Sequence, residues 1–215
     1  FYLEDQDGKV MFEANHVAAG FEIMPLLEGK FVFTTVRLFG FSFNLRKHTP
    51  ESPLNLQFVI DAFASKDSIK KEKNIDLRFN SIMIRRGNFS YNVDSEKETP
   101  GKFNAKHIDI KNLSAKISLK AFNKDSVNAH IKKMSFDEAS GFSLNKLSLN
   151  VVGNRDSAFV QDFEVRLPQT DLKIGRARID LSEIDSLPAL LNNAPIDLNI
   201  TPSQICLKDL SPFVP

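Results

Sequence analysis

The sequence contains no tryptophan and only two tyrosines among its 215 residues, although it contains 19 phenylalanines. Tyrosine and tryptophan combine apolar area with a polar tip, and they are enriched at protein interfaces. Their scarcity disfavours an adhesion or sugar-binding module. Phenylalanine supplies aromatic bulk without hydrogen bonding, which suits either an ordinary core or a surface that holds acyl chains.

Three further absences narrow the class of protein. Cys206 is the only cysteine, so no intrachain disulfide forms, and its place between Ile205 and Leu207 predicts a small packed side chain. No apolar run approaches the ~20 residues that a transmembrane helix needs. The 28 basic and 27 acidic side chains nearly balance. This balance disfavours a nucleic-acid partner.

Motifs for catalysis and metal binding are missing as well. The sequence has no G-x-S-x-G elbow, no P-loop and no G-x-G-x-x-G turn. Of the four histidines, only His107 and His130 lie in predicted strands that would let them approach each other, and zinc needs three or four ligands. We therefore expect no enzyme, no cofactor and no metal site, although the plentiful carboxylates leave a catalytic pair open.

Alternation of apolar and polar residues with a period of two dominates the chain. Period two is typical of strands with one wet face and one dry face, because successive side chains point to opposite sides. The polar partners are Asn, Lys, Ser, Arg and Asp, which favours antiparallel pairing. The clearest segments are 29–45, 80–93, 107–122, 141–151 and 172–182.

Most of these segments change phase at a short switch. The changes fall near Thr34–Thr35, at Gly40, at Arg85–Gly87 and at Lys111–Asn112. Glycine and asparagine adopt the left-handed backbone that a bulge needs, and bulges curve a sheet. The pattern predicts a mainly β chain that forms one curved sheet over residues 1–215. Short helices are predicted at 52–65 and 186–193, and loops at 46–53, 64–74, 94–102, 122–128 and 153–158.

The segment LFGFSFNL at 38–45 places Phe39, Phe41 and Phe43 on every second residue. Side chains so spaced share one face of a strand. They either fill a closed core or line a trough that takes up an apolar ligand. Residue types alone leave both interpretations open.

Several segments resemble the AsmA-like superfamily, and within it the TamB-type envelope proteins of bacteria with two membranes. Residues 2–45 resemble the strand pair, the "PLLEGK" turn and the strands that follow it in that family. Residues 53–63 resemble the next short helix. Further segments that resemble the family pattern are 80–93, 102–122, 134–151 and 167–174.

The resemblance implies a β-sheet rolled into a groove that is apolar inside and polar outside, like a taco shell. Phospholipid acyl chains would slide along it between the inner and the outer membrane, without enzymatic chemistry. The implied location is the periplasm, anchored to the inner membrane through a helix absent from this sequence. Since the chain begins at Phe1, we expect it to be a piece of a longer protein.

Partners and groove residues follow from the same resemblance. The partners would be acyl chains and, through the parent chain, an outer-membrane barrel protein. The alternative function is a scaffold for assembling outer-membrane β-barrel proteins, which would offer sheet edges to their strands. The residues predicted to line the groove are Phe31, Phe33, Phe39, Phe41, Phe43, Ile82, Ile84, Ile117 and Leu119, with Ser42 and Asn44 outside.

Overall fold

The computed structural model describes residues 1–24, 31–63, 77–122, 126–180 and 196–214. These residues form one mainly β structure with two short helical elements. The strands are β1 (Tyr2–Glu4), β2 (Val10–Phe21), β3 (Phe31–Lys47), β4 (Leu77–Val93), β5 (His107–Phe122), β6 (Ser126–Glu138), β7 (Ser143–Asn154), β8 (Ser157–Arg166), β9 (Asp171–Asp180) and β10 (Ile196–Ile200). The helices are α2 (Gln57–Phe63) and the 3-10 helix η1 (Leu207–Phe213).

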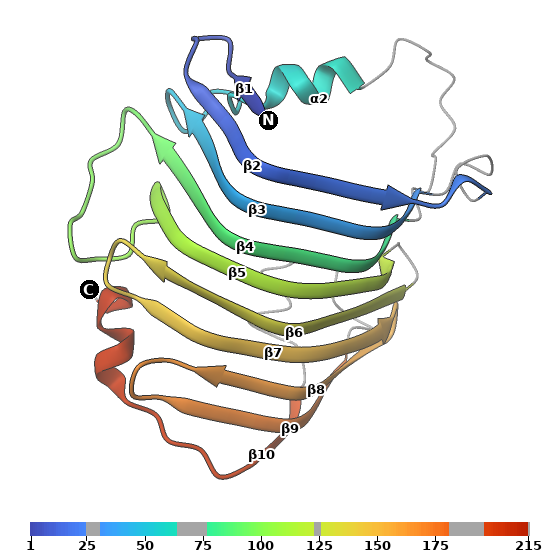
Figure 1. Ribbon diagram of the computed structural model, residues 1–215. Coiled ribbons are helices and arrows are strands. Elements are labelled where there is room, and N and C mark those ends of the chain that lie inside the picture. Colours follow the sequence, from blue (N-terminus) through green and yellow to red (C-terminus); the bar gives the residue numbers. More distant parts are fainter. Residues whose placement is uncertain (25–30, 64–76, 123–125, 181–195, 215) are drawn as a thin grey trace.

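The ten strands form a single open sheet in the order of the sequence, from β1 at one edge to β10 at the other (Figure 1). Neighbouring strands are antiparallel except β3 and β4, which are parallel. Our expectation of antiparallel pairing fails at this pair because residues 48–76 connect the two strands. A connection of that length can carry the chain back to the end of the sheet where β3 begins, which a parallel pair requires.

The strands of the sheet are bent (Figure 1). A row of residues with left-handed backbone lies on β3, β4, β5 and β8. Gly40, Arg86, Asn112 and Asp162 have φ values of 56°, 53°, 57° and 52°. Phe39 pairs with Arg85 and Ser42 pairs with Asn88, so Gly40 lies opposite Arg86. The predicted switches at Gly40 and Asn112 are confirmed. In the third switch the left-handed residue is Arg86 rather than Gly87.

The left-handed backbone at Arg86 gives a testable preference for glycine. The Arg86 side chain is exposed, so Arg86→Gly and Arg86→Val remove the same charge. We expect Arg86→Gly to be as stable as the parent or slightly more stable. Arg86→Val should be about 1–2 kcal/mol less stable than Arg86→Gly, because a Cβ, and above all a β-branched one, is strained on a left-handed backbone. Urea denaturation of the two variants measures the difference, and equal stabilities would contradict it.

The described residues form one sheet, and none of them forms a second layer of strands packed on it. Among the described residues only Met11 and Val93 have fully buried large side chains. The accessible surface of the chain is 14457 Å², whereas a globular monomer of 24.2 kDa exposes about 10,000 Å². The apolar side chains are therefore half-buried in an open sheet rather than sealed in a core. Nowhere in the described ranges is a helix long and apolar enough to cross a bilayer.

Element boundaries follow the alternation closely, with some differences. Strands β4 and β5 match the predicted segments 80–93 and 107–122 within three residues. The predicted loop at 122–128 is wrong at its end, because Ser126 to Asn128 belong to β6 and pair with β7. The predicted loop at 153–158 shrinks to a tight turn between β7 and β8. The helix predicted at 186–193 and the loop at 64–74 lie outside the described residues.

The element η1 connects distant loops at one end of the strands. The Phe103 amide donates to the Pro212 carbonyl at 2.8 Å, and the Phe213 ring lies 5.0 Å from the rings of both Phe103 and Phe142. The Gln169 amide donates to Asp209 Oδ2 at 2.9 Å. This element thus ties the loop after β4 to the turns after β6 and β8. The Cys206 thiol, half-buried, donates to Gln169 Oε1.

Candidate functional site

An apolar hollow lies on one face of the sheet, which we call the inner face. It has a volume of about 620 Å³, and every residue that lines it is apolar. Side chains from six neighbouring strands meet there, which requires a concave surface. The lining residues are Leu3, Met11, Phe12, Leu38, Phe41, Phe43, Leu56, Phe89, Ile110, Leu113, Met134 and Phe136.

Strand register extends the inner face beyond this hollow. Leu38 lines the hollow and lies opposite Ile84, so Ile84 is on the same face. Two residues away, Ile82 lies opposite Ile117. Of the predicted groove residues, the register and the hollow place the following on the inner face: Phe33, Phe41, Phe43, Ile82, Ile84, Ile117 and Leu119. The Phe31 side chain lies outside the described residues.

Phe39 differs from the prediction and lies on the opposite face, which we call the outer face. Its ring stacks on His16 with centroids 5.5 Å apart, and the Arg85 guanidinium lies 5.7 Å from its centroid. The left-handed Gly40 changes the phase of β3, so Leu38 and Phe41 face inward and Phe39 does not. On the outer face a cation lies over the half-buried ring. Phe159 has the same arrangement with Arg176, at 5.1 Å.

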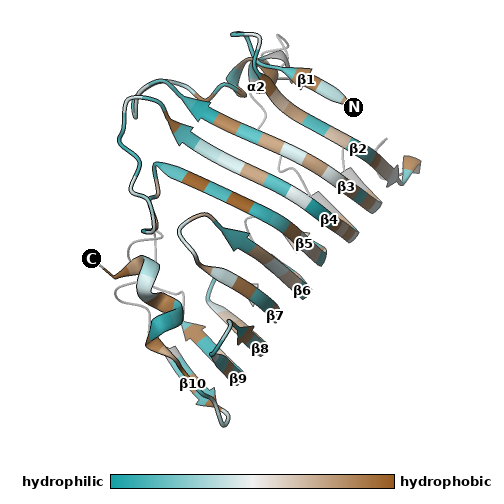
Figure 2. Cartoon of the chain, turned by 60° about the vertical axis from the view of Figure 1, so that its left-hand side comes forward, coloured by the Kyte–Doolittle hydropathy of each residue, from teal (hydrophilic) through white to brown (hydrophobic). Residues whose placement is uncertain are grey.

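Along the strands, hydrophobic and hydrophilic residues alternate across most of the sheet (Figure 2). The inner face continues past the hollow through buried Leu144 on β7, Ala158 on β8 and Ala177 on β9. Ala158 and Ala177 lie opposite Gly153 and Val160, respectively. Apolar side chains therefore form a continuous band across the strands. Among the described residues, no charged side chain lines the apolar hollow, which lies at the β1 end of this band.

Phe41 is a tightly packed residue in the lining of the apolar hollow. Its side chain is only 7% exposed, and its ring lies 6.1 Å from that of Phe12. The Phe41 ring covers Gly87 so closely that a Cβ there would lie 2.2 Å from Phe41 Cε1. Gly87 has an ordinary φ, so this position requires glycine for space rather than for conformation.

A buried ion pair joins the end of β3 to the turn between β1 and β2. Arg46 Nη2 lies 3.3 Å from Asp5 Oδ2 and 2.6 Å from Asp7 Oδ2, and the Asp5 side chain is 3% exposed. Burial opposes ionisation of Asp5. Hydrogen bonds from Asn55 and from the amides of Lys9 and Asp7, together with the Arg46 charge, outweigh it and hold the pKa of Asp5 below its ordinary value.

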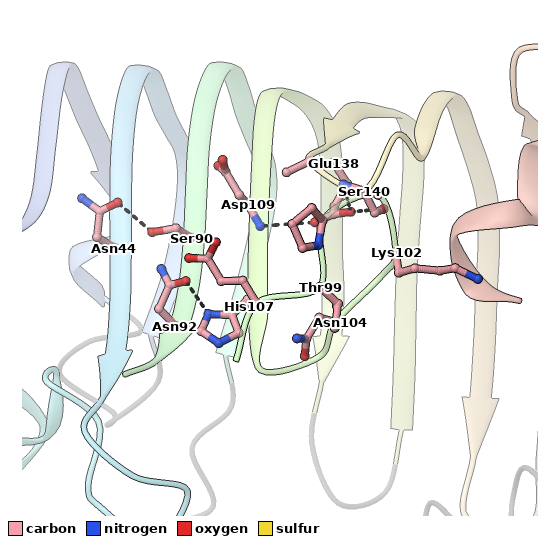
Figure 3. Close-up of a pocket in the computed structure, with 14 residues that line it drawn as sticks. Asn44, Ser90, Asn92, Thr99, Lys102, Asn104, His107, Asp109, Glu138 and Ser140 are labelled. Atoms are coloured by element: carbon pink, nitrogen blue, oxygen red, sulfur yellow. Dashed lines mark hydrogen bonds between the residues drawn. The ribbon is translucent and has the colours of Figure 1, made fainter. Parts of the chain in front are cut away.

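A second hollow, of about 530 Å³, is polar and lies at the ends of β3, β4 and β5 under the loop that follows β4 (Figure 3). Its side chains largely satisfy one another. Ser90 Oγ donates to Asn44 Oδ1, His107 bonds Asn92 and the Glu96 carbonyl, and Glu138 accepts from Ser140. The bond between His107 and the Glu96 carbonyl holds the loop onto β5, and the others join neighbouring strands or close a turn. We therefore take the apolar hollow as the functional site.

The histidine pair considered from sequence does not meet. His107 lies opposite Asn92 and His130 lies opposite Ser118, so eleven residues of β5 separate the two positions. At ~3.3 Å per residue the separation is roughly 36 Å. The described part of the chain contains no group of three His, Cys, Asp or Glu side chains arranged for a metal ion.

Sequence reasoning missed the residues that close the hollow at its β1 end. Leu3, Met11 and Leu56 come from a three-residue strand, from a register shift between β1 and β2 and from the turn before α2. None of them belongs to a long alternating run. A local signal existed only for Leu56, which begins the apolar spacing of the predicted helix.

Comparison with known proteins gives no relative for this chain, since no family model, no curated protein and no solved structure matches it.

Proposed function

We propose that the inner face is a groove for the acyl chains of phospholipids, and that the chain is a non-enzymatic, TamB-like segment of a periplasmic lipid-transport protein. The single observation that carries the proposal is the hollow of about 620 Å³ lined only by apolar side chains on an open sheet. Contiguous apolar surface on a soluble chain is costly unless something covers it. An acyl chain covers it and brings no polar group that needs a partner.

The mechanism we propose is transfer of methylene groups from water to the groove floor. Each buried methylene group gains about 0.8 kcal/mol. Leucine, isoleucine and phenylalanine offer no hydrogen bonds that would fix an acyl chain in one position. The chain would therefore move along the floor without a deep local minimum, while the polar headgroup stays outside the groove.

A matched pair of variants on β4 tests the groove. Phe89 lines the hollow and the adjacent Asn88 is exposed on the outer face, so Phe89→Glu and Asn88→Glu add the same charge on opposite faces. We expect purified parent protein and Asn88→Glu to carry phospholipid in organic extracts analysed by mass spectrometry, and to bind a fluorescent fatty acid. Phe89→Glu should bind about tenfold less or weaker still, because a carboxylate on the floor loses solvation when an acyl chain covers it.

A second variant separates loss of the site from loss of the fold. Leu113→Trp fills part of the hollow without a charge, and it should reduce fatty-acid binding while the circular dichroism spectrum stays that of a β protein. Parent protein that carries no lipid and does not bind the fatty acid would refute the proposal. Equal binding by Phe89→Glu and Asn88→Glu would also refute it.

The second candidate, a scaffold for outer-membrane β-barrel strands, has one observation in its favour. Strand β1 pairs only with the first residues of β2, so His16 to Gly20 have no strand partner on that edge among the described residues. Strand addition uses exposed backbone and needs no apolar floor. The all-apolar hollow therefore favours the lipid groove.

A further inference from the structure

The outer face carries a cluster of basic side chains that the groove does not use. A row runs across four strands from Arg37 through Met83 and Lys116 to Lys133, each directly opposite the next. The row spans about 14 Å, since neighbouring strands lie ~4.8 Å apart. The basic surface, as we name it, comprises Arg37, Arg85, Arg86, Lys116, Lys132 and Lys133, all of them exposed.

A bulge in β6 concentrates this charge. Lys133 lies opposite Lys116 and Ile131 lies opposite Ile117, so Lys132 is an extra residue on β6. Five of the six cations border one hollow of about 550 Å³, together with Met83, Ile84, Ser114 and Ala115 and with no carboxylate in its lining. Within the described ranges, none of the six takes part in an ion pair.

Clustered cations repel one another, which raises the electrostatic free energy of this face above that of a surface with mixed charges. The whole chain has a formal charge of +1, so six cations without a paired carboxylate represent charge segregation rather than overall basicity. Their mutual repulsion is relieved when an anionic surface approaches. In register, Glu164 lies two strands from Lys132 and Lys133, but it already pairs with Lys146 and Arg166. Glu13 and Asp137 lie at the margins, and Asp137 accepts hydrogen bonds from Asn112 and Ser143.

We infer that the basic surface binds the phosphate headgroups of an anionic lipid bilayer and holds the chain against it. The cations are flexible, exposed and spread over a sheet face, which matches several phosphates in a plane rather than one enclosed ligand. Each basic residue near an anionic bilayer strengthens binding about fivefold. The choice of a bilayer as partner rests on the proposed function. The charge complementarity does not.

Vesicle sedimentation tests the inference. Parent protein at low salt should sediment with vesicles of phosphatidylglycerol and phosphatidylethanolamine, and not with phosphatidylcholine vesicles. Lys132→Glu/Lys133→Glu should weaken this binding about 25-fold or more, from two lost cations alone. The control Lys97→Glu/Lys208→Glu makes the same change of net charge at exposed positions away from the basic surface, and it should bind within about twofold to threefold of the parent.

The variants test the proposed groove and the proposed basic surface separately. Lys132→Glu/Lys133→Glu should still bind the fluorescent fatty acid, and Phe89→Glu should still sediment with anionic vesicles. Equal sedimentation with both kinds of vesicle, or equal weakening by the two double variants, would overturn the inference. Tight binding to soluble polyglutamate without binding to anionic vesicles would overturn it in favour of an acidic protein partner.

Discussion

Gly87→Ala is expected to destabilise the protein by about 1–3 kcal/mol, although it adds a single methyl group. The new Cβ would lie 2.2 Å from Phe41 Cε1 and 2.4 Å from Cζ, so the ring must leave its place in the groove floor. Phe41 is packed against Phe12 and is only 7% exposed, so displacing its ring breaks packed contacts. Chemical denaturation measures the loss.

A double-mutant cycle assigns that loss to the contact. Phe41→Leu shortens the side chain that Gly87→Ala displaces, so the double variant should be less destabilised than the sum of the single variants, by about 0.5–3 kcal/mol. Gly175→Ala is the matched control, because its Cβ would meet Thr201 Cγ2 at an ordinary 3.6 Å. Additive effects of Gly87→Ala and Phe41→Leu would contradict this account.

Arg46→Met is expected to cost about 3–5 kcal/mol at neutral pH, because it leaves the buried Asp5 carboxylate without its counter-charge. Arg46 is 12% exposed and contacts Asp5, Asp7 and Asp94. The matched control is Arg166→Met, since Arg166 is 49% exposed beside Glu164 and Asp171. In Arg166→Met, Glu164 keeps Lys146 as its counter-charge, so this half-exposed control should lose only about 0–1 kcal/mol.

The pH dependence gives an independent readout of the same pair. The folded pKa of Asp5 is lowered from its ordinary value of 3.8, so ionised Asp5 stabilises the fold above that value, and the contribution is lost as pH falls through the folded pKa. The difference between the parent and Arg46→Met should therefore narrow as the solution is acidified. A difference that stays constant with pH, or an equal loss in Arg166→Met, would contradict the prediction.

Much of the fold follows from local alternation, because each strand has one wet face and one dry face. The direction of β3 relative to β4 does not follow, since an alternating strand reads alike in parallel and antiparallel pairs. Strand β6 was only partly predicted, because Lys132–Lys133 at its bulge interrupts the alternation. Strand β8 was not predicted, and its alternation is interrupted at Asp162, which has a left-handed backbone.

The groove floor was partly predictable, and the basic surface was not. Phe41 and Phe43 stand in one alternating run, and Ile82 and Ile84 stand in another, so each pair shares a face by period two. The prediction for Phe39 was wrong because the left-handed Gly40 shifts the alternation of β3 by one residue. Phe39 therefore faces the side opposite to Phe41 and Phe43. The cations at 37, 85–86, 116 and 132–133 are far apart in sequence, and only strand register brings them together.

The row of left-handed residues has a consequence for how such a protein grows. Because the bend is set within strands, by one left-handed residue in each of β3, β4, β5 and β8, it does not depend on a closing contact between the two outermost strands. Each further hairpin that carries its own kink would add about 9.6 Å of channel, at ~4.8 Å per strand, and keep the same profile. The length of the sheet, which the number of strands sets, is thus independent of its cross-section, which the bends set.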